Sequence, residues 1–211
     1  MTLFFWMSTR LFRFFFRVFY SLRVYGVDNI TRGGAIIAPN HASFFDPPII
    51  CAAWPEETHY LARKSLFDKP LLRGLISRLN AHPVTGTAQD LNSIKVICEL
   101  LNQHQKVVIF PEGERSDDGE LTEIKTGIAM LAMRCHCPII PAYIHGTYDV
   151  WPKQRRWPKL RGKIACVFGK PIFPDEFSSL TKKEAQIALA ARVFDDIQAL
   201  KHWYLLNIEK A

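Results

Sequence analysis

A histidine and an aspartate five residues apart, His41 and Asp46, are the first side chains in this sequence that could do chemistry. A neutral imidazole is the natural general base for an alcohol, and a carboxylate on its other nitrogen fixes the tautomer and stabilises the imidazolium. On one helix the two side chains would point about 140° apart. If Asp46 instead caps a helix that starts at Pro47, residues 41–45 form a loop that can return the imidazole to the carboxylate. By itself the pair is a weak signal, because a capping aspartate needs no catalytic role.

A second candidate group, Phe-Pro-Glu-Gly-Glu-Arg-Ser at residues 110–116, directly follows a predicted buried strand. Ligands of α/β proteins gather at the carboxyl ends of strands. Gly113 permits close approach of the backbone, and Arg115 can hold a phosphate through two hydrogen bonds. Alternatively, the segment is a surface turn with residues 117–119 at its tip.

The two groups together resemble the glycerolipid acyltransferase family. The resemblance starts with Asn-His-x-Ser-x-x-Asp at residues 40–46 and continues some 65 residues later with Phe-Pro-Glu-Gly-x-Arg-Ser. Further segments resemble blocks of the same family in the same order: residues 62–67 with Pro70, Lys-Thr-Gly at residues 125–127, and Cys-Pro-Ile-Ile-Pro-Ala at residues 137–142. The resemblance covers about residues 23–173.

The resemblance implies acyl transfer without an acyl-enzyme, a metal or a cofactor. In the family the motif histidine, here His41, deprotonates the acceptor hydroxyl, while the motif aspartate, here Asp46, orients and charges the imidazole. The alkoxide attacks an acyl thioester, which is acyl-CoA or acyl-ACP (acyl carrier protein). Arg115 is the expected phosphate partner. The residues that the resemblance assigns to substrate binding are Glu112, Gly113, Arg115 and, as added positive charge at a helix start, Lys125.

One family feature is missing. Members commonly carry an arginine after the Pro-Val pair of the second motif, whereas Pro83-Val84 is followed here by Thr-Gly-Thr at residues 85–87. Arg73 or Arg78 could replace it. The gap bears on the identity of the acceptor more than on the class of reaction.

The expected reaction moves a fatty acyl chain to the free sn-2 hydroxyl of lysophosphatidic acid, which gives phosphatidic acid for phospholipid synthesis. Three alternatives stay open: an acceptor with another lysophospholipid headgroup, a membrane-bound lipid-binding protein without catalysis, and a hydrolase in which water reaches His41. Acyl chain length, the donor and the oligomeric state are not encoded in the motifs.

An α/β domain must position these groups. Short β-rich runs alternate with helical patterns, which predicts one catalytic domain over residues 26–211 with a mixed, mainly parallel sheet flanked by helices. The predicted strands cover residues 35–38, 59–62, 107–110, 138–144 and 164–168. Thr181 and Glu184 form a capping box for a long closing helix. The apolar face predicted for that helix is Ile187, Ala190, Ala191, Phe194, Ile197 and Leu200.

Residues 1–25 form an amphipathic segment that we expect to anchor the protein to a membrane. They carry four arginines and no acidic residue, and no apolar run reaches the roughly 18 residues that a membrane-spanning helix needs. At about 100° per residue, Arg10, Arg13 and Arg17 fall within about 60° of one another. The opposite arc, which only Phe14 spoils, contains Leu11, Phe12, Phe15, Phe16, Phe19 and Leu22. This division is typical of a helix in the lipid interface, and the alternative is a helix packed on its own domain. A break near Ser8-Thr9 is expected.

A second basic segment, residues 151–163, carries six Lys or Arg residues and no acid. Outside both basic segments the chain holds 17 basic and 20 acidic residues. The tryptophans of the second segment suit a membrane interface; an acidic carrier protein, the phosphates of coenzyme A, or a solvated loop are the alternatives. Nucleic acid is not expected, because no binding motif accompanies the charge. Five cysteines without a framework spacing and the lack of a secretory signal favour the cytoplasmic face of a membrane. Cys135-His136-Cys137 lacks a second ligand pair, so no metal site is expected.

Overall fold

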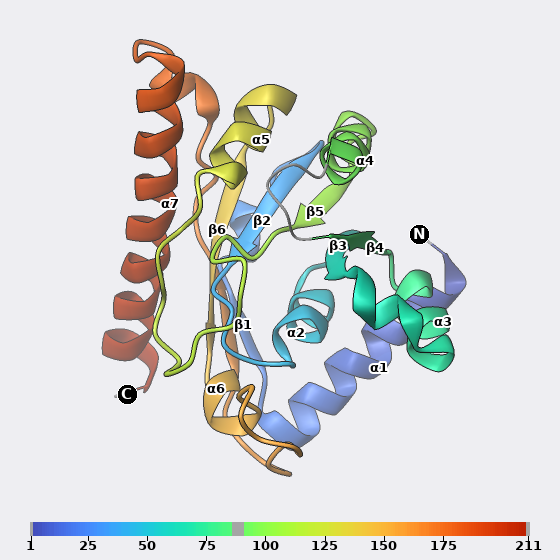
Figure 1. Ribbon diagram of the computed structural model, residues 1–211. Helices are drawn as coiled ribbons and strands as arrows, with labels where there is room; N and C mark the ends of the chain where they lie inside the picture. The colour runs from blue at the N-terminus through green and yellow to red at the C-terminus, as the bar shows by residue number, and fades with distance from the viewer. Residues whose placement is uncertain (1, 86–90, 210–211) are drawn as a thin grey trace.

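A seven-stranded sheet forms the centre of the computed structural model, which describes residues 2–85 and 91–209 (Figure 1). The strand order is β1-β7-β6-β2-β5-β3-β4. The strands are β1 Arg23–Tyr25, β2 Ala35–Pro39, β3 Thr58–Arg63, β4 Ala81–Val84, β5 Lys106–Val108, β6 Ile139–His145 and β7 Ala165–Phe168. All neighbouring pairs run parallel except β6 and β7, which are antiparallel. The predicted α/β fold with a mixed, mainly parallel sheet is therefore confirmed.

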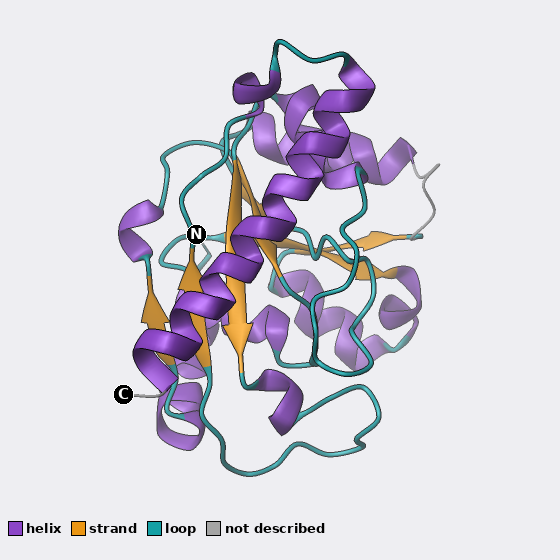
Figure 2. Cartoon of the chain, turned by 90° about the vertical axis from the view of Figure 1, so that its left-hand side faces the viewer, coloured by secondary structure: helices purple, strands orange, loops and turns teal. Residues whose placement is uncertain are grey.

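Helices cover both faces of this sheet. They are α1 Leu3–Tyr20, α2 Asp46–Ala53, α3 Pro70–Arg78, α4 Leu91–Asn102, α5 Gly127–Cys135, α6 Thr147–Val150 and α7 Lys182–Tyr204. Short helical turns are η1 Val27–Asn29, η2 Lys64–Asp68, η3 Pro174–Phe177 and the π-helical η4 Leu205–Glu209. Figure 2 shows α7 crossing one face of the sheet, and in Figure 1 α1 and α2 lie on the opposite side.

Strand β2 shows how the sequence builds two cores. Successive side chains of a strand point to opposite faces. Ala35 and Ile37 join the core beneath α1 and α2, whereas Ile36 and Ala38 join the core beneath α4, α5 and α7. A strand buried on both faces reads as one continuous apolar run, which is why this strand is readable from the sequence.

Helix α7 begins after Thr181 with the predicted capping box, in which the Thr181 hydroxyl donates to Glu184 at 2.7 Å. Its predicted apolar face is partly wrong. Ile187 is 52% exposed, whereas Leu189 and Val193 are completely buried. The helix is apolar over so much of its circumference that periodicity does not single out the inward row.

Helix α1 differs from its prediction in two ways. It is one continuous helix without a break at Ser8-Thr9, and the Thr9 hydroxyl donates to the carbonyl of Trp6 within it. Phe16, expected to face lipid, is buried in the core beside Phe5 and Tyr20. The most exposed apolar side chains form a row that shares only Leu11 with the expected arc: Leu3, Met7, Leu11, Phe14 and Val18. Phe19 from the expected arc is also exposed, as are Phe4 and Trp6. Within residues 2–85 and 91–209, every helix is too short or too polar to span a lipid bilayer.

Candidate active site

His41 follows β2, and Asp46 is the first residue of α2. The loop between them folds back, so that His41 Nδ1 lies 2.8 Å from Asp46 Oδ2. The same oxygen accepts the backbone N–H groups of Ala42 and Ser43 at 2.7 Å each. The two backbone N–H groups can only donate, so Asp46 Oδ2 is a hydrogen-bond acceptor. His41 Nδ1 then carries the proton that it donates to this oxygen. Nε2 of His41 is then left with a free lone pair, as a general base requires.

The loop reaches this geometry by a route that differs slightly from the sequence-based expectation. Phe45, not Asp46, occupies the N-cap position of α2. The Asp46 carboxylate accepts its backbone hydrogen bonds from Ala42 and Ser43 in the preceding loop, and not from the N-terminus of α2. Ser43 is buried and its hydroxyl donates to the carbonyl of Trp151 at 2.7 Å, which makes it a structural hydroxyl.

Asp46 has one further partner that sequence reasoning missed. Its Oδ1 atom accepts a hydrogen bond of 2.7 Å from the hydroxyl of Thr147, and both side chains are buried. Thr147 begins α6 directly after β6, the strand beside β2. In the sequence, Thr147 can be recognised only as a polar residue just after a predicted strand. Its position beside Asp46 can be inferred only when the order of the strands in the sheet is known. With this bond every polar atom of the buried carboxylate is paired.

Glu112 holds the two motif segments together. One carboxylate oxygen accepts the backbone N–H of His41 at 2.6 Å, and the other accepts both the N–H and the hydroxyl of Thr122. Burial raises the pKa of Glu112, although its hydrogen bonds and His41 act in the opposite direction. From the same segment, Ser116 donates its N–H to the His41 carbonyl, and the Phe110 ring stacks on the imidazole with ring centroids 3.9 Å apart. The Glu112 carboxylate thus positions His41.

Gly113 and Lys125 lie against each other beside this segment. Gly113 has a φ of +80°, and a β-carbon there would come within 2.7 Å of Lys125 Nζ. Lys125 also donates its backbone N–H to the carbonyl of Pro111. The ammonium group is therefore brought to the motif loop, with α5 starting two residues later at Gly127.

Arg115 presents an unused cationic donor. Its guanidinium group lies 3.6 Å above the ring of Phe44, and its buried Nη1 atom has no hydrogen-bond partner. Burial lowers the pKa of Arg115, while the charge of Asp46 raises it and that of Arg63 lowers it. A buried, unpaired guanidinium nitrogen is a ready partner for an anionic oxygen.

The position of the missing family arginine can be compared with its expected substitutes. Arg78 lies over the ring of Phe4 on α1, and Arg73 lies on α3 with it. Arg63, at the end of β3, is bound to Glu114 at 3.3 Å and acts electrostatically on Arg115. Of the motif residues that replace the arginine, 86 and 87 lie outside the described residues. The structure thus brings Arg63 to the site.

In the described part of the chain, no group of three or more metal-binding side chains gathers in one place. The Cys-His-Cys fragment is split: Cys135 Sγ lies 2.9 Å from Cys98 Sγ, and Cys137 is buried.

Both the sequence and the fold of this chain are similar to those of known proteins. A family model described as Acyltransferase matches residues 21–145. The 1-acyl-sn-glycerol-3-phosphate acyltransferase of Bacillus subtilis is 27% identical over 183 residues, which cover 86% of this chain and 88% of the relative. The enzyme of the same name from Limnanthes alba is 32% identical over 58% of this chain and 45% of its own.

The crystal structure of the 1-acyl-sn-glycerophosphate (LPA) acyltransferase PlsC from Thermotoga maritima superposes with a TM-score of 0.74 at 27% identity. The match covers 94% of this chain and 78% of that one. The family model spans more than half of the present chain and includes both His41 and Asp46, so the resemblance read from the motifs is confirmed: the protein belongs to the acyltransferase family.

Proposed function

We propose that the protein transfers a fatty acyl chain from a thioester to the sn-2 hydroxyl of lysophosphatidic acid and thereby forms phosphatidic acid. The observation that carries this proposal is the His41–Asp46 pair beside the unpaired nitrogen of Arg115. Together they supply a general base for a hydroxyl and a partner for a phosphate. Relatives that match at 27% and 32% identity are named for this reaction.

In the proposed reaction, His41 Nε2 takes the proton of the acceptor hydroxyl while Asp46 stabilises the imidazolium. The hydroxyl oxygen forms the new ester bond to the acyl carbon, and the carbon–sulfur bond of the thioester breaks. The imidazolium returns the proton to the departing thiolate, so the enzyme ends as it began. Arg115 holds the acceptor phosphate, with Lys125 and Arg63 as nearby cations.

The acyl donor is acyl-CoA or acyl-ACP, which serves as a co-substrate, and the reaction needs no further cofactor. The basic segment 151–163 supports an acidic donor, because it adjoins the active site. The backbone carbonyl of Trp151 accepts a hydrogen bond from the Ser43 hydroxyl, and the Lys153 ammonium group donates to the carbonyl of Arg115 at 3.2 Å. The phosphates of coenzyme A and the acidic residues of a carrier protein are both negatively charged, and a basic segment attracts either of them.

We further propose that α1 lies on the cytoplasmic face of a membrane, where a one-chain phospholipid resides. The exposed row of Leu3, Met7, Leu11, Phe14 and Val18 is apolar, and arginines border it. This row has the pattern of a helix in the lipid interface. It shares only Leu11 with the arc expected from the sequence, whose other side chains, except Phe19, are buried or half-buried against the domain.

The test is release of free thiol from a long-chain acyl-CoA in mixed micelles, with and without lysophosphatidic acid. We expect release that requires the acceptor and yields phosphatidic acid. His41→Ala should lose at least about a hundredfold in turnover, while His202→Ala, an exposed histidine on α7, should keep wild-type turnover.

Other outcomes identify the competing functions. Thiol release without an acceptor would mean a hydrolase. Release only with another lysophospholipid would correct the headgroup. If neither acyl-CoA nor acyl-ACP releases free thiol with any lysophospholipid, the protein binds lipid without catalysis and the proposal is wrong.

A further inference from the structure

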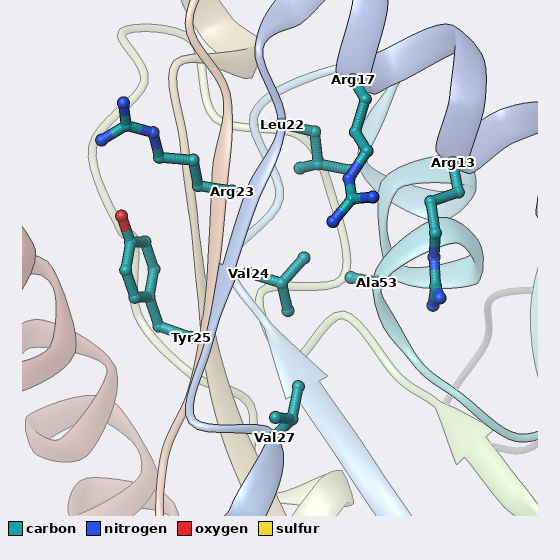
Figure 3. A pocket seen from close by; sticks show the side chains of 8 residues that line it. All are labelled: Arg13, Arg17, Leu22, Arg23, Val24, Tyr25, Val27 and Ala53. Atoms are coloured by element: carbon teal, nitrogen blue, oxygen red, sulfur yellow. The ribbon is translucent and has the colours of Figure 1, made fainter.

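A cavity of about 420 Å³ opens between α1, the edge strand β1 and the end of α2. It is lined by Arg13, Arg17, Leu22, Arg23, Val24, Tyr25, Val27 and Ala53 (Figure 3). No acidic residue is among them. Ala53 ends α2 and Asp46 begins it, so the length of that helix, about 12 Å, separates the cavity from the catalytic aspartate.

Two guanidinium groups face this space. Figure 3 shows Arg13 and Arg17 reaching from α1 toward Val24 and Ala53, while the side chains of Arg23 and Tyr25 leave β1 on its other side. Arg13 Nε donates to the carbonyl of Ala52 at 2.8 Å, which fixes its orientation and leaves the terminal nitrogens for a ligand.

Arg17 is free to bind. Within residues 2–85 and 91–209 no carboxylate forms an ion pair with it. A cation that projects into a cavity without a counter-ion favours an anionic ligand.

β1, the edge strand of the sheet, lines the cavity opposite α1. The guanidinium groups of Arg13 and Arg17 together form a donor set that suits phosphate oxygens.

The rest of the surroundings favours a lipid over a free ion. Leu22, Val24 and Val27 give the cavity an apolar floor. Three residues along a helix correspond to about 60° around it, so Arg17 borders the exposed apolar row at Phe14. An amphiphile could thus place its phosphate in the cavity and its chains along that row.

We propose that this cavity binds the phosphate group of an anionic phospholipid whose acyl chains lie against the exposed row of α1. The inference rests on the proposed membrane binding of α1 and goes beyond it, because it predicts one saturable site for a single lipid. That site is separate from the acceptor phosphate site at Arg115.

The test is titration of the full chain with monomeric short-chain phosphatidylglycerol, below its micelle concentration, by isothermal titration calorimetry. Wild type should show saturable binding that Arg17→Gln weakens by about tenfold or more, since hydrogen bonds to a charged group are lost. Arg10→Gln is the matched control on the same helix, because Arg10 lies over the Trp6 ring and outside the cavity. Arg115→Gln controls for binding at the active site. Both should change the affinity by less than about twofold.

Equal weakening by Arg17→Gln and Arg10→Gln would show that surface charge acts generally, and would overturn the proposal. Wild-type affinity of Arg17→Gln would do the same. Inorganic phosphate that binds as tightly as the lipid and is equally sensitive to Arg17→Gln would overturn a lipid as the ligand. Binding to phosphatidylcholine vesicles and thiol release, measured on the same variants, report separately on α1 and on catalysis, so failure of the cavity site is distinguishable from failure of the proposed function.

Discussion

The carboxylate of Asp46 is fully buried and accepts hydrogen bonds from four partners: His41, Ala42, Ser43 and Thr147. A buried charge is tolerated only when it is paired in this way. Because three of the four bonds come from the protein frame and not from the imidazole, the orientation of His41 is set before substrate arrives. Such preorganisation lowers the reorganisation needed at the moment of reaction.

Thr147 should therefore be a positioning residue for catalysis. We expect Thr147→Val to lower kcat by about tenfold with little change in KM, because a hydrogen bond to a charged group is lost, and Thr147→Ser to restore kcat. Steady-state kinetics of both variants, with thermal unfolding as the control, test this. If Thr147→Val lost stability but kept the wild-type kcat, Thr147 would have only a structural role.

The active-site residues differ in how far the sequence alone identifies them. His41, Asp46 and Arg115 were identifiable because their two motifs together resemble one family, although either motif alone also fits a helix cap or a surface turn. Thr147 was not, because it meets Asp46 across 101 positions of the chain. That contact exists only because β6 lies beside β2, and strand order is not written in local spacing.

Among the elements, α7 offers a direct test of which helix row holds the domain together. Leu189 is fully buried, whereas Ile187, assigned to the core by periodicity, is 52% exposed. We expect Leu189→Ala to reduce the free energy of unfolding by about 2–5 kcal/mol. Ile187→Ala, a matched change on the same helix, should cost less than about 1 kcal/mol. Urea denaturation measures both, and equal losses would contradict the observed orientation of α7.

The paired strands β3 and β4 predict a pH dependence of stability. His59 Nδ1 and His82 Nε2 lie 3.0 Å apart. Burial lowers the pKa of both side chains below 6.5, and His59 lowers that of His82 further. Below that pH the unfolded chain binds more protons than the folded one, so stability falls as the pH falls. The double variant His59→Gln/His82→Gln should weaken this loss in urea denaturation between about pH 7 and pH 5, and an unchanged slope would contradict it.

Periodicity locates helices and strands better than it orients them. The two-sided apolar pattern of β2 left only one reading, because both faces are buried. Helix α1 carries apolar side chains on nearly all of its circumference except the arginine row. Either apolar arc could have faced the domain, and only the fit of Phe16 and Tyr20 against Phe45 of the active-site loop decides it.

The two basic segments of the chain meet in the folded molecule. The Tyr20 hydroxyl at the end of α1 donates to the carbonyl of Lys159 at 2.8 Å, so residues 1–25 and 151–163 adjoin at one end of the molecule (Figure 1). Leu160 and Trp157 are strongly exposed in the second segment. Cationic groups interleaved with exposed apolar ones on adjoining elements form a surface suited to an anionic lipid interface.

This arrangement leads to a prediction that separates membrane binding from folding. Leu11 and Phe14 are 64% and 65% exposed, so Leu11→Glu and Phe14→Glu remove apolar surface that no part of the domain covers. Burying one such side chain contributes about 1.5–3 kcal/mol. Each variant should therefore bind phosphatidylcholine vesicles at least about tenfold more weakly, while its melting temperature stays within a few degrees of wild type.

Phe16→Ala is the opposite control: it should lower the melting temperature, because Phe16 is a core residue. Undiminished vesicle binding by the double variant Leu11→Glu/Phe14→Glu would place the membrane contact elsewhere, with Trp157 and Leu160 as the next side chains to change.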